Sequence, residues 1–174
     1  IAGAVMVAVA IVVIAAMTLA ALVHTSAPAP MAVAIRAGLV GLLAAQVTGV
    51  WMLGHGLALV DADADPTTQS MSTVGAAGQM KFTHAVPMHA IQVLAVLAWW
   101  LSRSGLRRRR QTQLVALAVV GYGGLFGVAL WRTSAGLGPV EPLDGSTLGY
   151  LPAAAFLAAP AVAAITGHRR HPPA

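Results

Sequence analysis

Residues 2–23, AGAVMVAVAIVVIAAMTLAALV, decide the fold class because this stretch contains no charged side chain. The hydrocarbon core of a bilayer is about 30 Å thick, and about 20 helical residues at about 1.5 Å each are needed to cross it. A helix also satisfies its own backbone hydrogen bonds in lipid. The stretch therefore predicts a membrane-spanning helix, since it is too long for a simple signal-peptide core.

Four later stretches meet the same test and are separated by turns and loops rich in Pro, Gly or charged residues. They are Met31–Leu57, Thr83–Leu101, Thr112–Trp131 and Leu148–Thr166. No soluble domain remains between them. The sequence therefore predicts an all-α fold, a polytopic membrane helix bundle with about five transmembrane helices that forms a single domain over residues 1–174.

The composition agrees with a membrane protein and excludes several other classes. Of the 174 residues, 58% are hydrophobic and 9% are charged, whereas soluble domains carry roughly a quarter charged residues. The net charge of +5 does not indicate a nucleic-acid partner, because the basic residues lie in short clusters at the ends of apolar stretches, beside lipid headgroups. The chain has no Cys, which excludes disulfides, thiolate ligands and Cys nucleophiles.

The distribution of Lys and Arg predicts the topology, because positive charge resists translocation. Lys81 and Arg132 fall on the outer side when the loop around Arg108 is cytoplasmic. The other basic residues then fall on the inner side: Arg36, Arg103, Arg107, Arg108, Arg109, Arg110, Arg169 and Arg170. We expect a multi-pass protein of the bacterial cytoplasmic (inner) membrane with a cytoplasmic C-terminus. Arg36 needs no role beyond reaching the headgroups with its long side chain.

Small residues recur at one-turn spacing on three of the predicted helices, and such faces let backbones approach closely in lipid. We expect them to bring the helices together. The faces are Gly41, Ala45 and Gly49; Gly123 and Gly127; and Ala155, Ala159 and Ala163.

No Asp or Glu lies within any predicted span. Ionisable side chains inside the membrane are expensive and usually functional. Their absence argues against a proton-coupled carrier with a buried acid. It also argues against prenyl transfer, which needs paired aspartates to hold Mg²⁺.

Residues 78–92, GQMKFTHAVPMHAIQ, contain the candidate site, at the outer end of the third predicted helix. Pro87 suits the first turn of a helix, which would leave His84 in the preceding loop, free to fold back toward His89. His55 should lie at the same depth, on the second predicted helix. We therefore predict His55, His84, His89 and Met88 as metal ligands, and His89, His84 and Gln92 as cofactor-binding residues.

This stretch resembles a group of uncharacterised bacterial multi-pass membrane proteins with an H-x4-H-A-x-Q pattern preceded by G-x-x-[RK]. The matching residues are Gly78, Lys81, His84, His89, Ala90 and Gln92. The likeness extends over the second to fourth predicted helices. It implies membership of a family and no particular activity.

Three functions remain open, and whether the chain is an enzyme is not decided by the sequence. The absence of a complete motif favours a non-catalytic accessory or scaffold subunit, with other membrane protein subunits as partners. An alternative is a redox protein that binds haem b or copper at the outer-face His cluster, since imidazoles ligate haem iron and His with Met suits copper. A second alternative is a quinone- or lipid-binding protein, in which His89 and Gln92 bond a carbonyl.

Overall fold

The computed structural model describes residues 2–62, 73–74, 78–140 and 143–170, and within them the chain is an all-α membrane helix bundle. Its main helices are α1 (Ala2–Val23), α2 (Ala29–Asp61), α4 (Met80–Met88), α5 (Ala90–Ser102), α6 (Arg108–Ser134) and α7 (Tyr150–Arg170). A 3₁₀ turn, η1 (Thr147–Gly149), precedes α7. The strands β1 (Thr73–Val74) and β2 (Gly78–Gln79) form one small antiparallel pair. 

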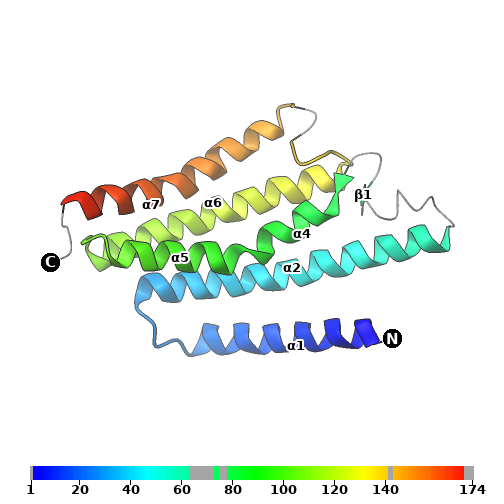
Figure 1. Ribbon diagram of the computed structural model, residues 1–174, viewed down its shortest axis with the longest axis horizontal. Helices are drawn as coiled ribbons and strands as arrows, with labels where there is room; N and C mark the ends of the chain where they lie inside the picture. Colours follow the sequence, from blue (N-terminus) through cyan, green and yellow to red (C-terminus); the bar gives the residue numbers. More distant parts are fainter. Residues whose placement is uncertain (1, 63–72, 75–77, 141–142, 171–174) are drawn as a thin grey trace.

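The described part of the chain contains five helical segments that are long and apolar enough to cross a membrane, which confirms the predicted architecture. The third of them, residues 80–102, consists of α4 and α5. Helix α1 has the predicted bounds, whereas α2, α6 and α7 are longer than their predicted spans. Because the number of spans in the described residues is odd, α1 starts at one end of the bundle and α7 finishes at the opposite end (Figure 1).

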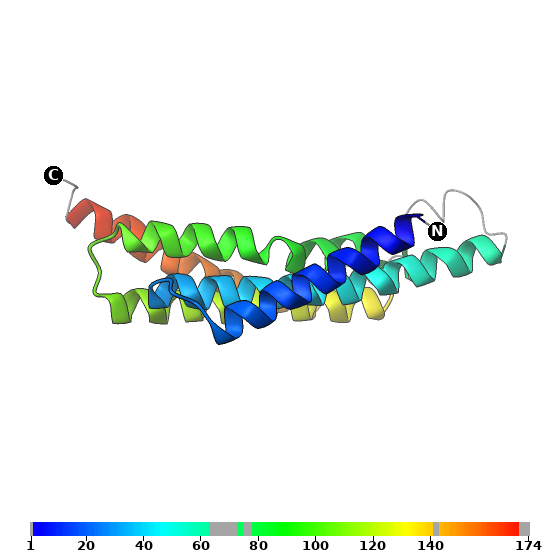
Figure 2. The same ribbon diagram turned by 90° about the horizontal axis from the view of Figure 1, so that it is seen from below.

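The core of the bundle is formed by α2, α5, α6 and α7. Helix α2 packs against α4, α5 and α6, and α7 lies along α6. The buried core side chains are small or aliphatic: Ala34, Ala90, Leu94, Leu97, Ala98, Leu101, Leu114, Val115, Ala118 and Ala164. Helix α1 makes its main contacts with α2 and is inclined relative to the other helices (Figure 2). Most of the described side chains of α1 are exposed.

The third span is broken at His89, which separates α4 from α5. Pro87 lies in the last turn of α4 and not in a first turn, so the prediction that His84 precedes the helix is wrong. The helix begins earlier, at Met80, directly after β2. A proline inside a helix removes one backbone donor and its ring crowds the carbonyl four residues before it. The break follows within two residues.

The small-residue face of α2 forms close contacts as predicted. A Cβ atom on Gly41 would lie 2.8 Å from Ala90 Cβ and 3.0 Å from the Pro87 carbonyl oxygen. Ala45 is fully buried. A Cβ atom on Gly49 would lie 3.0 Å from the His84 ring. These positions hold α2 against α4 and α5.

The predicted small-residue face of α6 does not form such contacts, and of the predicted face of α7 only Ala163 packs against the core. A Cβ atom on Gly123 or Gly127 would meet nothing within 4 Å, and Ala155 and Ala159 are exposed. Helix α6 instead approaches α7 at Gly121, where a Cβ atom would lie 2.8 Å from the Ala153 carbonyl oxygen. In helices this rich in Ala and Gly, small residues occur on several faces, and spacing does not identify the face that packs.

We predict that Gly121→Ala lowers the thermal stability of the protein, whereas Gly127→Ala does not. Crowding a packed contact typically costs about 1–3 kcal/mol, and the added methyl group at Gly121 meets backbone atoms of α7. At Gly127 the methyl group meets open space, and Ala is the better helix former by about 1 kcal/mol. Melting in mild detergent checks this. Equal melting temperatures for the two variants would contradict the packing of α6 on α7.

Candidate functional site

His84 lies on the side of α4 that faces α2, and its ring is held by the α2 backbone. Its Nδ1 atom is 2.8 Å from the Ala45 carbonyl oxygen and 3.4 Å from the Thr48 hydroxyl. A carbonyl oxygen only accepts hydrogen bonds, so Nδ1 carries a proton and donates it. In the neutral ring, Nε2 is then the atom left to accept a hydrogen bond or bind a metal.

His89 and Gln92 lie at the break between α4 and α5, and both are exposed. The Gln92 amide has one orientation in which both its oxygen and its nitrogen face suitable partners. In that orientation the nitrogen donates to the carbonyl oxygens of His89 at 3.0 Å and Met88 at 3.2 Å. Gln92 therefore provides a donor to carbonyls beside the break. Met88 itself is half-buried in the last turn of α4.

The structure does not gather the predicted ligands into one group. His84 lies against Ala45 and Gly49, whereas His55 is six residues beyond Gly49, which is about 9 Å along α2. Within the described ranges, no three His, Asp or Glu side chains lie close enough together to hold a metal ion. His55, His84 and His89 therefore do not form a three-ligand site there.

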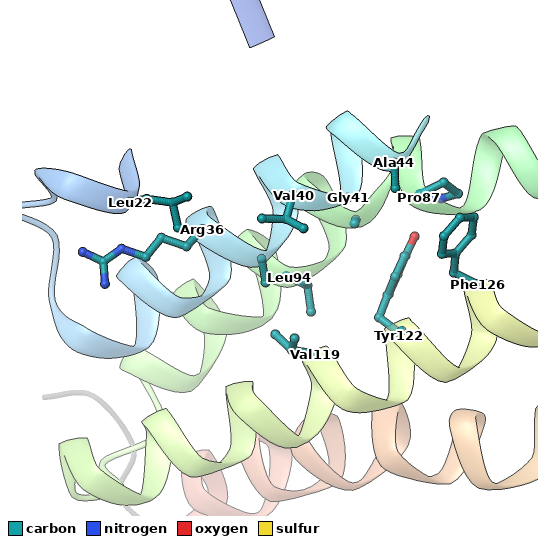
Figure 3. A pocket seen from close by; sticks show the side chains of 13 residues that line it. Leu22, Arg36, Val40, Gly41, Ala44, Pro87, Leu94, Val119, Tyr122 and Phe126 are labelled. Carbon is teal, nitrogen blue, oxygen red and sulfur yellow. The ribbon is translucent and has the colours of Figure 1, made fainter. Parts of the chain in front are cut away.

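A cavity of about 410 Å³ lies between the C-terminal end of α1 and helices α2, α4, α5 and α6 (Figure 3). Ligand pockets in proteins commonly measure about 300–1,000 Å³. Apart from Arg36 and Tyr122, the lining side chains are apolar: Leu22, Ala37, Val40, Gly41, Ala44, Pro87, Ala90, Leu94, Val119, Gly123 and Phe126. None of the predicted site residues lines this cavity.

Tyr122 crosses the inner part of the cavity with its hydroxyl toward Pro87 (Figure 3). The hydroxyl donates to the Val86 carbonyl oxygen at 2.8 Å. This carbonyl also accepts from the His89 backbone N–H at 3.3 Å. Tyr122 therefore stabilises the break in the third span, and its only proton is already used.

Arg36 lies at the other end of the cavity, beside Leu22 (Figure 3). Its Nε atom donates to the Ala21 carbonyl oxygen at 2.9 Å. This carbonyl is in the last turn of α1, where backbone acceptors lack helical partners and favour a cation. Arg36 thus joins α1 to α2, a role that the sequence did not indicate.

A second polar cluster, which sequence reasoning missed, lies at the predicted outer end of the bundle. Arg132, at the end of α6, is fully buried. Its Nε donates to the Gly138 carbonyl oxygen at 2.9 Å, and its Nη1 lies 2.7 Å from Asp144 Oδ1. The same nitrogen donates to the hydroxyls of Ser146 and Thr147. Arg132 therefore ties the loop before α7 to α6.

Asp144 is partly exposed, with 38% of its side chain accessible. The Ser146 hydroxyl, the Thr147 backbone N–H and the Arg132 guanidinium together hold the pKa of Asp144 well below its ordinary value, against the opposing effect of desolvation. In the sequence, this ion pair is indicated only by Arg132 at a helix end and by Asp144 in the loop that follows.

We predict that Asp144→Asn lowers the melting temperature at neutral pH and that the difference from wild type becomes smaller below about pH 4. A carboxyl group whose pKa is lowered in the folded protein stabilises it above the unfolded value of about 3.9. This contribution is lost as the pH falls below that value. Melting curves should therefore show a constant difference from pH 7 to about 5 and a smaller one below about 4. A difference that is the same at pH 7 and pH 3 would contradict the ion pair.

Comparison with known proteins does not assign this site. No family model matches the chain, and no curated protein or solved structure matches it either. The resemblance based on Gly78, Lys81, His84, His89, Ala90 and Gln92 stays a prediction. The candidate site is therefore defined by the chain's own geometry, as an apolar cavity with a guanidinium at one end.

Proposed function

We propose that this protein binds a lipophilic molecule, a lipid or a quinone, in the cavity between α1, α2, α5 and α6. The observation that carries the proposal is the cavity itself, which has a volume of about 410 Å³ and apolar walls. Ligand sites of this kind combine a mostly apolar lining with a few polar groups that fix orientation. Arg36 and Tyr122 are the polar side chains of the lining.

Access to the cavity from the bilayer supports the same function. The cavity is partly open, and its boundary includes Leu22 near the end of α1. Leu22 is 48% exposed. An apolar molecule dissolved in the bilayer therefore has a path to this space that does not cross water.

The other two functions have less support from the described residues. The haem or copper alternative is supported by the hydrogen bond from His84 Nδ1–H, since such bonds orient metal-ligating imidazoles. Within the described residues, however, no three His, Asp or Glu side chains lie close enough together to hold a metal ion. A Soret band or stoichiometric copper would favour it.

The accessory-subunit alternative is supported by the exposed faces of α1, but lipid can also cover these faces. A ligand-free protein that co-purifies with one partner subunit would favour that alternative.

We further propose that the protein lies in a bacterial inner membrane with its C-terminus in the cytoplasm. Five membrane-length helices in the described residues and the eight-to-two distribution of the basic residues support this orientation. It assigns Arg36 and the start of α6 to the cytoplasmic side. Arg132 and Asp144 are then near the outer face.

Filling the cavity tests the proposed function. We predict that Gly123→Leu removes most of the bound lipophile, because Gly123 lines the cavity and its Cβ position has no neighbour within 4 Å. Gly127→Leu is the matched control, since it adds the same side chain one turn away on α6 into open space outside the lining. Native mass spectrometry of both variants from mild detergent would measure the bound molecules. Equal occupancy in the two variants would overturn the cavity as the binding site.

Cysteine labelling tests the topology, and the natural absence of Cys leaves no background. Arg108 begins α6, and Gly145 follows the far end of that helix. We predict that Arg108→Cys and Gly145→Cys react with a membrane-impermeant maleimide from opposite sides of the membrane, Gly145→Cys from outside intact cells. Labelling of both positions from the same side would contradict the orientation.

A further inference from the structure

We propose that the ligand is an anionic phospholipid, with its phosphate on Arg36 and an acyl chain in the cavity; this inference rests on the proposed function. It specifies the chemical class of the ligand and its direction in the cavity. Three properties support it: the charge of Arg36, the depth of Arg36 in the membrane, and the shortage of hydrogen-bond donors elsewhere in the lining.

The positive charge of Arg36 has no acidic partner within the described residues, where the ion pair is that of Arg132 with Asp144. Its Nε donates to the Ala21 carbonyl oxygen, which is neutral. A guanidinium has five N–H donors, so most of them remain available for an anion. Asp61 ends α2 twenty-five residues later, about 37 Å away along the helix. Of the acids in the described part of the chain, Asp61 is therefore too distant to neutralise Arg36, and Asp144 is paired with Arg132.

The depth of Arg36 matches the level of lipid phosphates. Helix α2 has 33 residues and is therefore about 50 Å long, which exceeds the hydrocarbon core by about 20 Å. If this excess is divided between the two ends, the core begins about 10 Å from the start of α2. Arg36 is seven residues after Ala29, which is also about 10 Å. Its guanidinium therefore lies where hydrocarbon meets headgroups.

The cavity continues from Arg36 toward the middle of the bilayer. Along α2 its lining extends from Arg36 to Ala44, a distance of about 12 Å. Val40 and Leu94 face it between these ends (Figure 3). A molecule with a charged end and an apolar chain fits this gradient, with the charged end at Arg36.

The polar groups favour a phospholipid over a quinone. A quinone carbonyl needs a hydrogen-bond donor, and the Tyr122 hydroxyl already donates to Val86. The rest of the lining, apart from Arg36, has no polar side chain. Arg binds phosphate oxygens in pairs through its planar donors. The available donors therefore suit a phosphate at the end of the cavity better than a carbonyl within it.

The test is competitive lipid binding to the full-length protein, measured by native mass spectrometry. The probes are phosphatidylglycerol and phosphatidylcholine with identical acyl chains, and a short-chain benzoquinone as the neutral competitor. We expect wild type to prefer phosphatidylglycerol by about fivefold or more, as for a basic residue near anionic headgroups. Arg36→Gln should lose this preference. Arg36→Lys should keep part of it, because it retains the charge without the planar donors.

Arg109→Gln is the control, because Arg109 is an exposed basic residue at the N-terminal end of α6 that does not line the cavity. It should bind like wild type. An unchanged preference in a folded Arg36→Gln protein would overturn the phosphate assignment, as would stronger binding of the quinone than of either lipid. If Gly123→Leu excludes both lipids equally and Arg36→Gln changes nothing, the cavity proposal stands and this inference fails. If Gly123→Leu excludes neither lipid, both fail.

Discussion

A lipid bilayer offers no water to a backbone N–H or C=O group, and this constraint governs the arrangement of the bundle. The chain satisfies it with long helices and with side chains at the places where a helix is interrupted. Pro87 removes a donor from the third span, and the span breaks at His89. The carbonyl groups beside the break accept hydrogen bonds from Tyr122 and Gln92. One residue that cannot donate thus determines the roles of two polar side chains on α5 and α6.

The same constraint explains the orientation of the other polar side chains within the helices. Arg36, His84 and Arg132 each donate to a backbone carbonyl oxygen of another segment. The bonds of Arg36 and His84 join two helices without a second charged side chain, which suits spans that contain no Asp or Glu. An imidazole in such a bond already has a structural role. Its presence in the membrane is therefore a weaker sign of metal binding than the sequence alone suggests.

The sequence predicted the helices well because the length of an apolar stretch is a local property. The position of Pro87 in its helix was not predictable in the same way, since it depends on where the helix begins, and α4 begins next to β2. Gly41 was predicted to lie at a helix contact, and it lies against Ala90, whereas Gly121, which lies against Ala153, was not predicted to do so. Small residues show where close packing is allowed, while the neighbouring helix determines which of them is used.

The candidate site was less predictable than the helices because it is made by several segments. The cavity takes its walls from α1, α2, α4, α5 and α6. Its residues recur at helical spacing within α2 and within α6, but the sequence does not show which helices face one another. The His residues attracted attention because their chemistry is distinctive. The lining consists instead of Gly, Ala and aliphatic residues, which have the same appearance in a helix contact and in a cavity wall.

Arg36 on α2 and Arg132 on α6 differ in one respect that bears on function. Arg132 is buried with a carboxylate, hydroxyls and a carbonyl oxygen around it, so the protein itself supplies its counter-charge. Arg36 receives a single carbonyl oxygen from the described residues. Charges in the membrane are costly unless they are paired or reach the headgroups. At Arg132 the protein meets this requirement alone, whereas Arg36 has no counter-charge among the described residues and lies at one end of the cavity.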